Sequence, residues 1–69
     1  MNKYEIIVYW SQEDNRFIAE VPELHGCMAE GENQIEAINN VNTIINEWIE
    51  TAIQTKRDIP KHKGRLLFA

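Results

Sequence analysis

The most reactive side chains of this sequence lie together in segment 21–27, where Glu23, His25 and Cys27 alternate along the chain. This is the composition of a Cys/His nucleophile or of part of a metal site. A nucleophilic pair needs hydrogen-bond contact and a third group that orients the imidazole, and a zinc site needs more ligands than this stretch offers. We therefore expect Cys27 to be a small core residue and His25 a solvated loop residue, with no catalytic or metal-binding role.

Carboxylates form a second candidate site, a two-metal nuclease centre. They are Glu13, Asp14, Glu20, Glu23 and Glu30. Such a centre requires carboxylates that converge on two ions about 3.5–4 Å apart. Glu13 and Asp14 fall in a predicted turn, and Glu20 and Glu30 are outward alternates of predicted strands. We expect a solvated acidic surface instead, with no metal, no cofactor and no enzymatic activity.

The charge is unevenly distributed along the 69 residues, whose formal net charge is −4. Residues 1–55 carry ten acidic and two basic side chains, a net −8, whereas residues 56–69 carry five basic and one acidic, a net +4. An acidic body repels phosphates, which argues against nucleic-acid binding and suits a basic protein partner. The simpler interpretation, that acidity keeps a small protein soluble, also explains the charge.

The length predicts a single domain, 1–69. A core of this size supplies only about 3–5 kcal/mol, and one cysteine excludes an intramolecular disulfide, so we expect self-association to a dimer or higher oligomer. A lone cysteine suits a reducing compartment. The sequence shows no signal peptide and no apolar run long enough to span a membrane, so we expect a cytoplasmic location.

Two strands are predicted before the reactive segment, at 4–10 and 16–21, because both stretches are rich in β-branched and aromatic residues. In the first, alternation separates Tyr4, Ile6, Val8 and Trp10 from Glu5, Ile7 and Tyr9. Neither side is fully polar, so one should meet the core and the other is available to a partner. In the second, Phe17, Ala19 and Val21 share a side. The polar turn at 11–15 contains Asn15, which tolerates a left-handed conformation.

The segment after the second strand has a structural interpretation. Pro22 ends the strand, Leu24 turns into the core, and Gly26 takes a conformation closed to other residues. The functional alternative is a partner-contacting loop. A short third strand is predicted at 27–30, after which Gly31 frees the backbone to turn.

A long helix is predicted from Asn33, which has the spacing of a capping box with Glu36. Its apolar stripe is expected to pack on the sheet and consists of Ile35, Ile38, Val41, Ile45, Trp48, Ile49, Ala52 and Ile53. Trp48 should be a core residue, while Trp10 suits either the core or a second subunit. Basic residues close the helix, and Ile59-Pro60 prevents its continuation.

A last strand is predicted at 65–69, which completes the order β-β-β-α-β of an α+β fold. The basic residues from Lys56 to Arg65 could touch RNA, but they lack interleaved aromatics. The alternative is helix-terminal charge followed by a protected edge strand.

Taken together, these segments resemble the HicB-type antitoxin domains over essentially the whole chain. The likeness rests on the aromatic first strand, the acidic turn, Val21-Pro22-Glu23-Leu24-His25-Gly26-Cys27, Gly31-Glu32-Asn33-Gln34-Ile35-Glu36-Ala37, Trp48-Ile49-Glu50 and Ile59-Pro60. The matching family-motif positions are Val21, Pro22, Leu24, Gly26, Cys27, Gly31, Glu36, Ala37 and Pro60.

The resemblance implies a partial ribonuclease H-like fold without catalytic acids: a three-stranded antiparallel sheet, one amphipathic helix packed on it, and a short C-terminal strand. It also implies a dimer or higher oligomer that neutralises a small basic mRNA-cleaving toxin of the HicA type by direct binding and occlusion. Many family members continue into a DNA-binding domain after the Ile-Pro segment. This sequence stops at Ala69, so DNA binding is not expected of it.

The alternative is an orphan self-associating interaction domain of the same fold with no cognate toxin. The candidate partner-binding residues are Trp10, Glu13, Asp14, Glu20 and Glu23.

Overall fold

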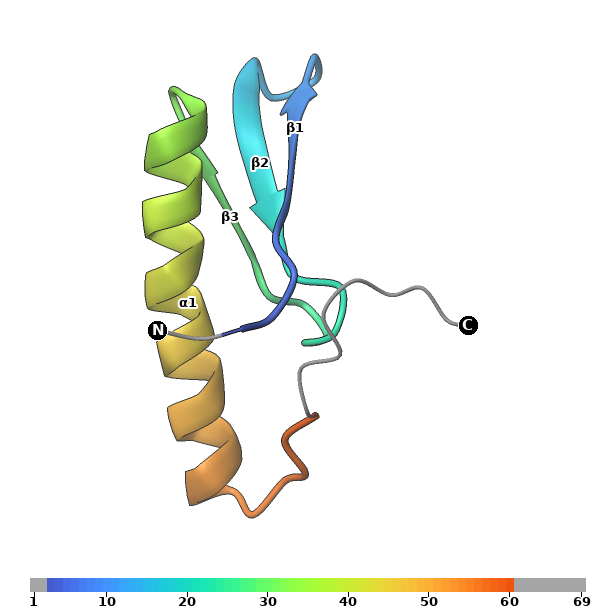
Figure 1. Ribbon diagram of the computed structural model, residues 1–69, viewed down its shortest axis with the longest axis vertical. Coiled ribbons are helices and arrows are strands. Elements are labelled where there is room, and N and C mark those ends of the chain that lie inside the picture. The colour runs from blue at the N-terminus through green and yellow to red at the C-terminus, as the bar shows by residue number, and fades with distance from the viewer. Residues whose placement is uncertain (1–2, 61–69) are drawn as a thin grey trace.

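The computed structural model describes residues 3–60, which form three strands and one long helix. The strands are β1 (Ile7–Ser11), β2 (Arg16–Glu20) and β3 (Met28–Gly31), and the helix is α1 (Gln34–Gln54). The antiparallel strands lie in the order β1-β2-β3, and α1 packs along one face of the sheet, giving two layers (Figure 1). This is the predicted α+β fold. The predicted last strand at 65–69 lies outside the described residues.

The hairpin between β1 and β2 is held by its own turn. The Ser11 hydroxyl donates to the Asp14 carboxylate (3.2 Å) and accepts from the Asp14 amide (3.3 Å). Asn15 has a φ of 55°, the left-handed conformation predicted for it. Since β1 begins at Ile7, later than predicted, Tyr4 lies before the ladder, where its hydroxyl donates to the carbonyl of Pro60.

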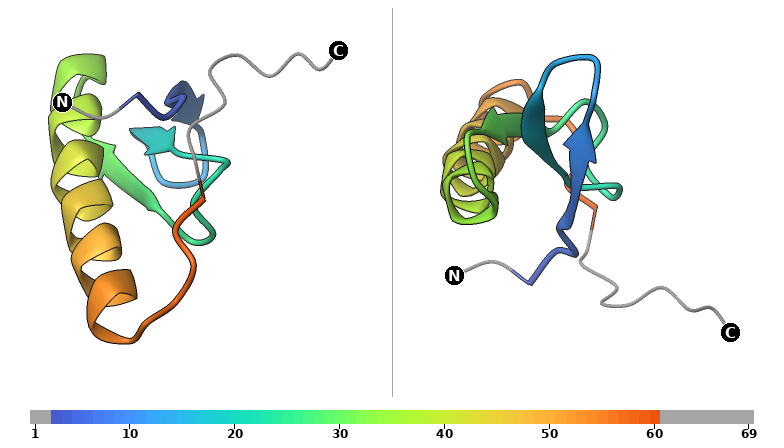
Figure 2. Two further views of the ribbon diagram at one scale, coloured as in Figure 1. Left: turned by 60° about the horizontal axis from the view of Figure 1, so that its bottom comes forward. Right: turned by 90° about the horizontal axis from the view of Figure 1, so that it is seen from above.

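Phe17, Ala19 and Val21, which were predicted to share one side of the second strand, face α1. Ala19 and Val21 are buried, and Phe17 packs against the core cluster. The main core cluster consists of Ala19, Val21, Leu24, Cys27, Ala37, Val41 and Ile45. Complete burial of a side chain such as Ile45 stabilises the fold by about 1.5–3 kcal/mol. This cluster joins α1 to the covered side of β2 and to the loop that follows it. Figure 2 shows from two further sides that α1 lies along one face of the sheet.

Gly31 has a different role from the one predicted. It is the buried last residue of β3, and its φ is not positive, so it does not serve a left-handed turn. A Cβ added here would lie 2.4 Å from the amide nitrogen of Ala37 and 2.8 Å from the carbonyl carbon of Glu36. The glycine therefore allows the strand to approach the backbone of α1 closely.

The start of α1 is the predicted cap, with one change. The Asn33 side chain accepts from the Glu36 amide (2.8 Å), as in a capping box. The Glu36 carboxylate, however, accepts from the amide of Glu32 (2.6 Å) rather than from that of Asn33. The bond from Asn33 satisfies an amide that the first helical turn leaves without a partner, and the bond to Glu32 ties the preceding residue to the helix.

The end of α1 follows the Schellman pattern. The Arg57 amide donates to the Ala52 carbonyl (2.8 Å) and the Lys56 amide to the Ile53 carbonyl (3.2 Å). Lys56 has a φ of 59°, so a lysine occupies the left-handed position where glycine is usual. The left-handed backbone at Lys56 therefore ends the helix, several residues before Pro60, which was predicted to prevent its continuation.

Two residues of the predicted apolar stripe do not face the sheet. Ile35 is 72% exposed and Ile53 is 63% exposed, whereas Ala37, Val41, Ile45 and Ala52 are buried. At 3.6 residues per turn, Ile35 and Ile53 lie on the same side of α1, about a quarter turn or more from the centre of the buried side. The predicted apolar stripe therefore includes one residue near each end of the helix, Ile35 and Ile53, that the sheet does not cover.

Trp48 packs against the core as predicted, and its indole nitrogen donates to the carbonyl of His25 (2.9 Å). The guanidinium carbon of Arg57 lies 5.8 Å from the centroid of the Trp48 ring, within cation–π range.

Within the described part of the chain, no helix has the length and apolarity needed to cross a bilayer.

Candidate functional site

The reactive segment 21–27 is a loop closed by its own backbone. The Val21 amide donates to the Cys27 carbonyl (3.0 Å), the Leu24 amide to the Val21 carbonyl (3.1 Å), and the Cys27 amide to the Leu24 carbonyl (3.0 Å). Leu24 is 1% exposed, and Gly26 has a φ of 78°. Pro22 lies just past the end of β2. The structural interpretation of the loop is confirmed at these positions.

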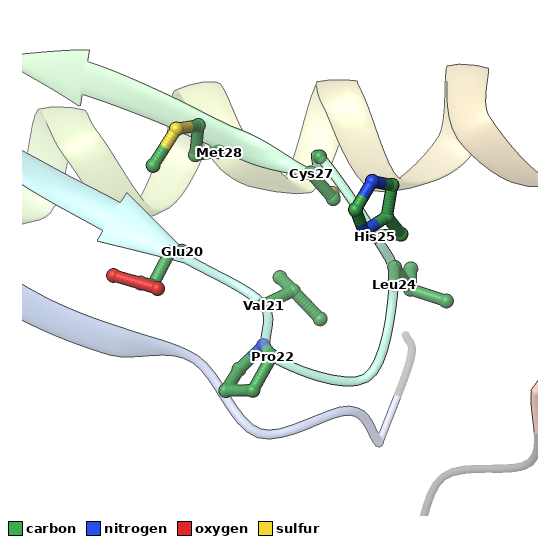
Figure 3. Close-up of a pocket in the computed structure, with 8 residues that line it drawn as sticks. Glu20, Val21, Pro22, Leu24, His25, Cys27 and Met28 are labelled. Carbon is green, nitrogen blue, oxygen red and sulfur yellow. The ribbon is translucent and has the colours of Figure 1, made fainter.

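The two reactive residues of the loop, Cys27 and His25, differ in exposure. A hollow of about 150 Å³ lies beside the loop and includes both residues in its lining (Figure 3). Cys27 is buried and His25 is exposed, as predicted. Burial raises the pKa of the Cys27 thiol, which disfavours the thiolate that would attack a substrate. In residues 3–60, no group of three His, Cys, Asp or Glu side chains is placed to hold a metal ion.

The face of the sheet opposite α1, which we call the open face, has a different character. The strand register places two rows across it, Ile7–Glu20–Met28 and Tyr9–Ile18–Glu30. Met28 is 49% exposed, Ile7 and Tyr9 are also exposed, and only Ile18 at the centre is buried, at 8%. An apolar surface that α1 does not cover thus runs over all three strands.

Acidic side chains surround this apolar surface. A groove of about 410 Å³ is lined by Tyr9, Ser11, Glu13, Asp14, Ile18, Met28, Ala29 and Glu30. Arg16 lies on the same face and its Nε is 3.3 Å from Glu30 Oε1. Such an exposed pair contributes at most about 1 kcal/mol. Among residues 3–60 no other ion pair is formed on this face, where Glu13, Asp14 and Glu20 also lie. The open face therefore combines exposed apolar groups with excess negative charge.

The electrostatics of Tyr9 reflect this setting. Desolvation raises the pKa of its hydroxyl, and the Glu20 carboxylate raises it further by its charge and by a hydrogen bond. The charge of Asp14 acts in the same direction. The raised pKa keeps the Tyr9 hydroxyl protonated at neutral pH, so that it can donate to the Glu20 carboxylate.

Of the five predicted partner-binding residues, Glu13 and Asp14 lie together at the hairpin turn and line the groove, whereas Glu20 lies on the open face at the other end of β2. Trp10 lies on the other side of β1, where its ring packs edge to face on Phe17 with the centroids 5.0 Å apart. Glu23 lies in the closed loop, and its carboxylate accepts from the amide of Glu5 (3.4 Å). Trp10 and Glu23 therefore belong to other surfaces.

The sequence-based set of partner residues omits Ile7, Tyr9, Met28 and Glu30, which complete the open face. The alternation of β1 contained a signal for Ile7 and Tyr9, since that side of the strand is apolar yet opposite the predicted core side. For Met28 and Glu30 the alternation of the predicted third strand gave an outward side, but only the register of β3 against β2 shows that this side continues the open face.

Comparison with known proteins identifies the family. Residues 3–60 match the UPF0150-like family. A UPF0150 protein of Synechocystis sp. is 35% identical over 63 residues, which cover 91% of this chain and 85% of the relative. A UPF0150 protein of Thermoplasma acidophilum is 32% identical over 59 residues, which cover 86% of this chain and 84% of the relative. No solved structure gives a significant match. The chain therefore belongs to the UPF0150-like family.

Proposed function

We propose that this chain is a HicB-like antitoxin module that binds a small basic mRNA-cleaving toxin of the HicA type and covers its RNA-binding surface. The observation that carries the proposal is the open face, where Tyr9, Ile7 and Met28 are exposed and the surrounding carboxylates are in excess. A toxin that binds RNA presents basic groups to phosphates, and these groups complement an acidic partner. The motif resemblance of the whole sequence to HicB-type domains supports the same function.

The proposed action is non-catalytic. Apolar contacts at Tyr9, Met28 and Ile7 would supply the desolvated centre of the interface, and the carboxylates around them would form its polar rim. Rim charges mainly raise the association rate and select the sign of the partner. Inhibition would then follow from occupation of the toxin's substrate surface, in the cytoplasm, where mRNA is present and a lone cysteine stays reduced.

The test is binding to a small basic protein encoded beside this gene, measured by calorimetry and by inhibition of its RNA cleavage. We expect micromolar affinity or better and stoichiometric inhibition. If no neighbouring basic protein binds with that affinity, the toxin-neutralising function is wrong and the orphan interaction domain takes its place.

A pair of charge-matched variants locates the surface. Glu13→Lys with Glu20→Lys reverses two charges at the open face, whereas Glu47→Lys with Glu50→Lys reverses two exposed charges on α1. Because both variants change the net charge equally, general electrostatic attraction affects them alike. We expect the first to weaken binding at least about tenfold and the second to change it by less than about threefold. Equal weakening by both would show that the open face is not the contact surface.

A further inference from the structure

The groove beside the hairpin turn of the open face is lined by two kinds of surface. We call it the hairpin groove; its volume is about 410 Å³, and its lining consists of Tyr9, Ser11, Glu13, Asp14, Ile18, Met28, Ala29 and Glu30. One part of this lining is apolar and the other is acidic. The volume is near the lower end of the range of about 300–1,000 Å³ for ligand pockets, so the groove suits one large side chain.

The carboxylates of the hairpin groove are available to an incoming group. The Ser11 hydroxyl holds Asp14 in place through its amide and its Oδ2 atom. The Asp14 Oδ1 atom and the Glu13 carboxylate have no hydrogen bond or ion pair within residues 3–60. Only Glu30 is engaged, through the exposed pair with Arg16. Two carboxylates at the turn therefore face the groove without a partner of their own.

The hairpin groove stays negative when the nearby cation is counted. Its three carboxylates carry −3, and Arg16, the basic residue of the three strands, carries +1, which leaves a formal charge of −2. The other basic residues of the described chain lie elsewhere. Lys3 precedes β1, His25 lies in the loop at the far end of β2, and Lys56 and Arg57 follow α1, whose end is remote from the β1–β2 hairpin (Figure 1).

The lining favours a cation that carries an apolar stem. Among residues 3–60, no three His, Cys, Asp or Glu side chains are placed to hold a metal ion. Tyr9, Ile18, Met28 and Ala29 supply apolar surface, which a small hydrated ion does not use. A long basic side chain packs its methylene stem on such surface and keeps its charged head at polar groups. This kind of side chain matches both parts of the lining.

Between the two long basic side chains, the groove favours arginine. The Tyr9 ring is 41% exposed and lines the groove, and its hydroxyl is engaged with Glu20. A guanidinium group is planar, is more weakly hydrated than an ammonium group and stacks on aromatic rings. Its five N–H donors can also reach carboxylates that come from different elements, here the hairpin turn and β3. An ammonium group offers a single compact charge.

The row of residues next to the groove adds a second requirement. Ile7, Glu20 and Met28 form this row, which lies two residues along the strands from the row that contains Tyr9. Two residues of a strand span about 7 Å. A partner covers both the row and the groove when an apolar side chain lies about 7 Å from its arginine. This is the spacing of residues i and i+2 in a strand, and nearly that of i and i+4 in a helix.

We propose that the hairpin groove is the anchor point of the open face, where an arginine side chain of a basic partner protein is held between the Tyr9 ring and the carboxylates of Glu13, Asp14 and Glu30. An apolar side chain of the same partner, about 7 Å away, packs on Ile7 and Met28. This inference rests on the proposed function, since it names the chemistry by which the open face recognises its partner.

The test uses the full chain and a short synthetic peptide in place of the partner. The peptide is capped at both ends and consists of glycine and serine, with one leucine and, two residues later, one arginine. Two further peptides carry lysine or citrulline in place of the arginine, the second of which keeps its shape without its charge. NMR titration at low salt should show shifts at the groove residues. We expect the lysine peptide to bind at least about threefold more weakly and the citrulline peptide about tenfold more weakly.

Two variants and one matched control assign the binding to the hairpin groove. Tyr9→Leu removes the ring but keeps an apolar side chain, so the preference for arginine over lysine should fall to nearly one. Glu13→Gln should weaken the arginine peptide about threefold or more, whereas Glu50→Gln, the same change on the exposed side of α1, should leave its affinity unchanged. The three positions are exposed, and urea unfolding of each variant should confirm that it folds.

Three results would overturn the inference. They are no shift at the groove with millimolar arginine peptide, equal binding of the arginine and citrulline peptides, and equal effects of Glu13→Gln and Glu50→Gln. Failure of the antitoxin function is a separate outcome, because the peptides can bind the groove even when no neighbouring basic protein does. Conversely, a basic toxin whose binding is unaffected by both Tyr9→Leu and Glu13→Gln would support the antitoxin function and overturn the anchor point.

Discussion

The two faces of the sheet are built from the same three strands but meet different demands. Toward α1, β2 and β3 place Ala19, Ala29 and Gly31, whose small side chains let the helix approach. On the open face the same strands place Ile18, Glu20, Met28 and Glu30. The part of the covered face that lies under α1 is explained by packing, since Ala19, Ala29 and Gly31 leave room for the helix. The open face is not explained in this way, because exposed apolar groups contribute little to folding.

This difference separates residues that hold the fold from residues that are free to bind. The loop 21–27 belongs with the covered face, although its residue types suggested chemistry. Substitutions at the covered face and in the loop should therefore lower stability, and substitutions at the open face should not. Four predictions test this division, in order of expected effect on the free energy of unfolding.

The largest effect is expected for Leu24→Ala. Leu24 is 1% exposed, and removal of a buried leucine side chain costs about 2–5 kcal/mol. A core of this size supplies only about 3–5 kcal/mol, so most of the variant should be unfolded at 25 °C. Urea unfolding followed by circular dichroism measures this. A loss below about 1 kcal/mol would mean that the loop does not depend on its buried leucine.

Gly31→Ala should be next. The added Cβ would meet the backbone of Ala37 at 2.4 Å, and backbone cannot move away as a side-chain tip can. We expect a loss of about 1–3 kcal/mol as β3 and α1 separate. Gly26→Ala is the matched control, because its Cβ would meet nothing within 4 Å and the cost comes only from its φ of 78°. That cost should be about 1 kcal/mol. A larger loss at Gly26 than at Gly31 would contradict the close-approach explanation.

Asn33→Ala should lower stability by about 1 kcal/mol, because the side-chain acceptor for the Glu36 amide is lost. Asn33→Asp retains an acceptor and adds a favourable charge at the helix start, so it should keep wild-type stability. Thermal and urea unfolding of the three chains make the comparison. Equal loss in both variants would indicate that the cap hydrogen bond does not stabilise α1.

The smallest effect on stability is expected for Met28→Thr on the open face. Threonine suits a strand, and the methionine is 49% exposed, so stability should change by less than about 0.5 kcal/mol. The same change should weaken binding of the proposed basic partner, because it removes an exposed apolar group from the open face. If stability instead falls as far as in Leu24→Ala, the open face has a structural role and the division between the faces fails.

Local chemistry explains which features could be predicted. The hairpin at Asn15, the end of β2 at Pro22, the inward Leu24 and the cap at Asn33 all depend on a few neighbouring residues. The role of Gly31 could not be predicted, because a close approach involves a residue that α1 brings near only after folding. The exposure of Ile35 and Ile53 was also missed, since helical period defines an apolar stripe without stating how much of it the sheet can cover.

The candidate site shows the same limit. Sequence reasoning selected Glu13, Asp14 and Glu20 from charge, and these lie on one side of the molecule. It also selected Trp10 and Glu23, which lie on other surfaces, and it passed over Met28 in β3. Strand alternation assigns sides within one strand, but the pairing of neighbouring strands decides which sides form one face.

Within residues 3–60, the sequence by itself thus determined the three strands, the helix, their order and the local reasons for the loop 21–27. In this loop Gly26 is required by a left-handed turn, Pro22 ends the strand, and Leu24 makes a buried contact, and each of these depends on neighbouring residues alone. Only the tertiary structure decided which residues share the open face and which isoleucines remain on the outside of α1. These depend on strand register and on the width of the sheet under the helix, and both are set by contacts between segments far apart in the chain.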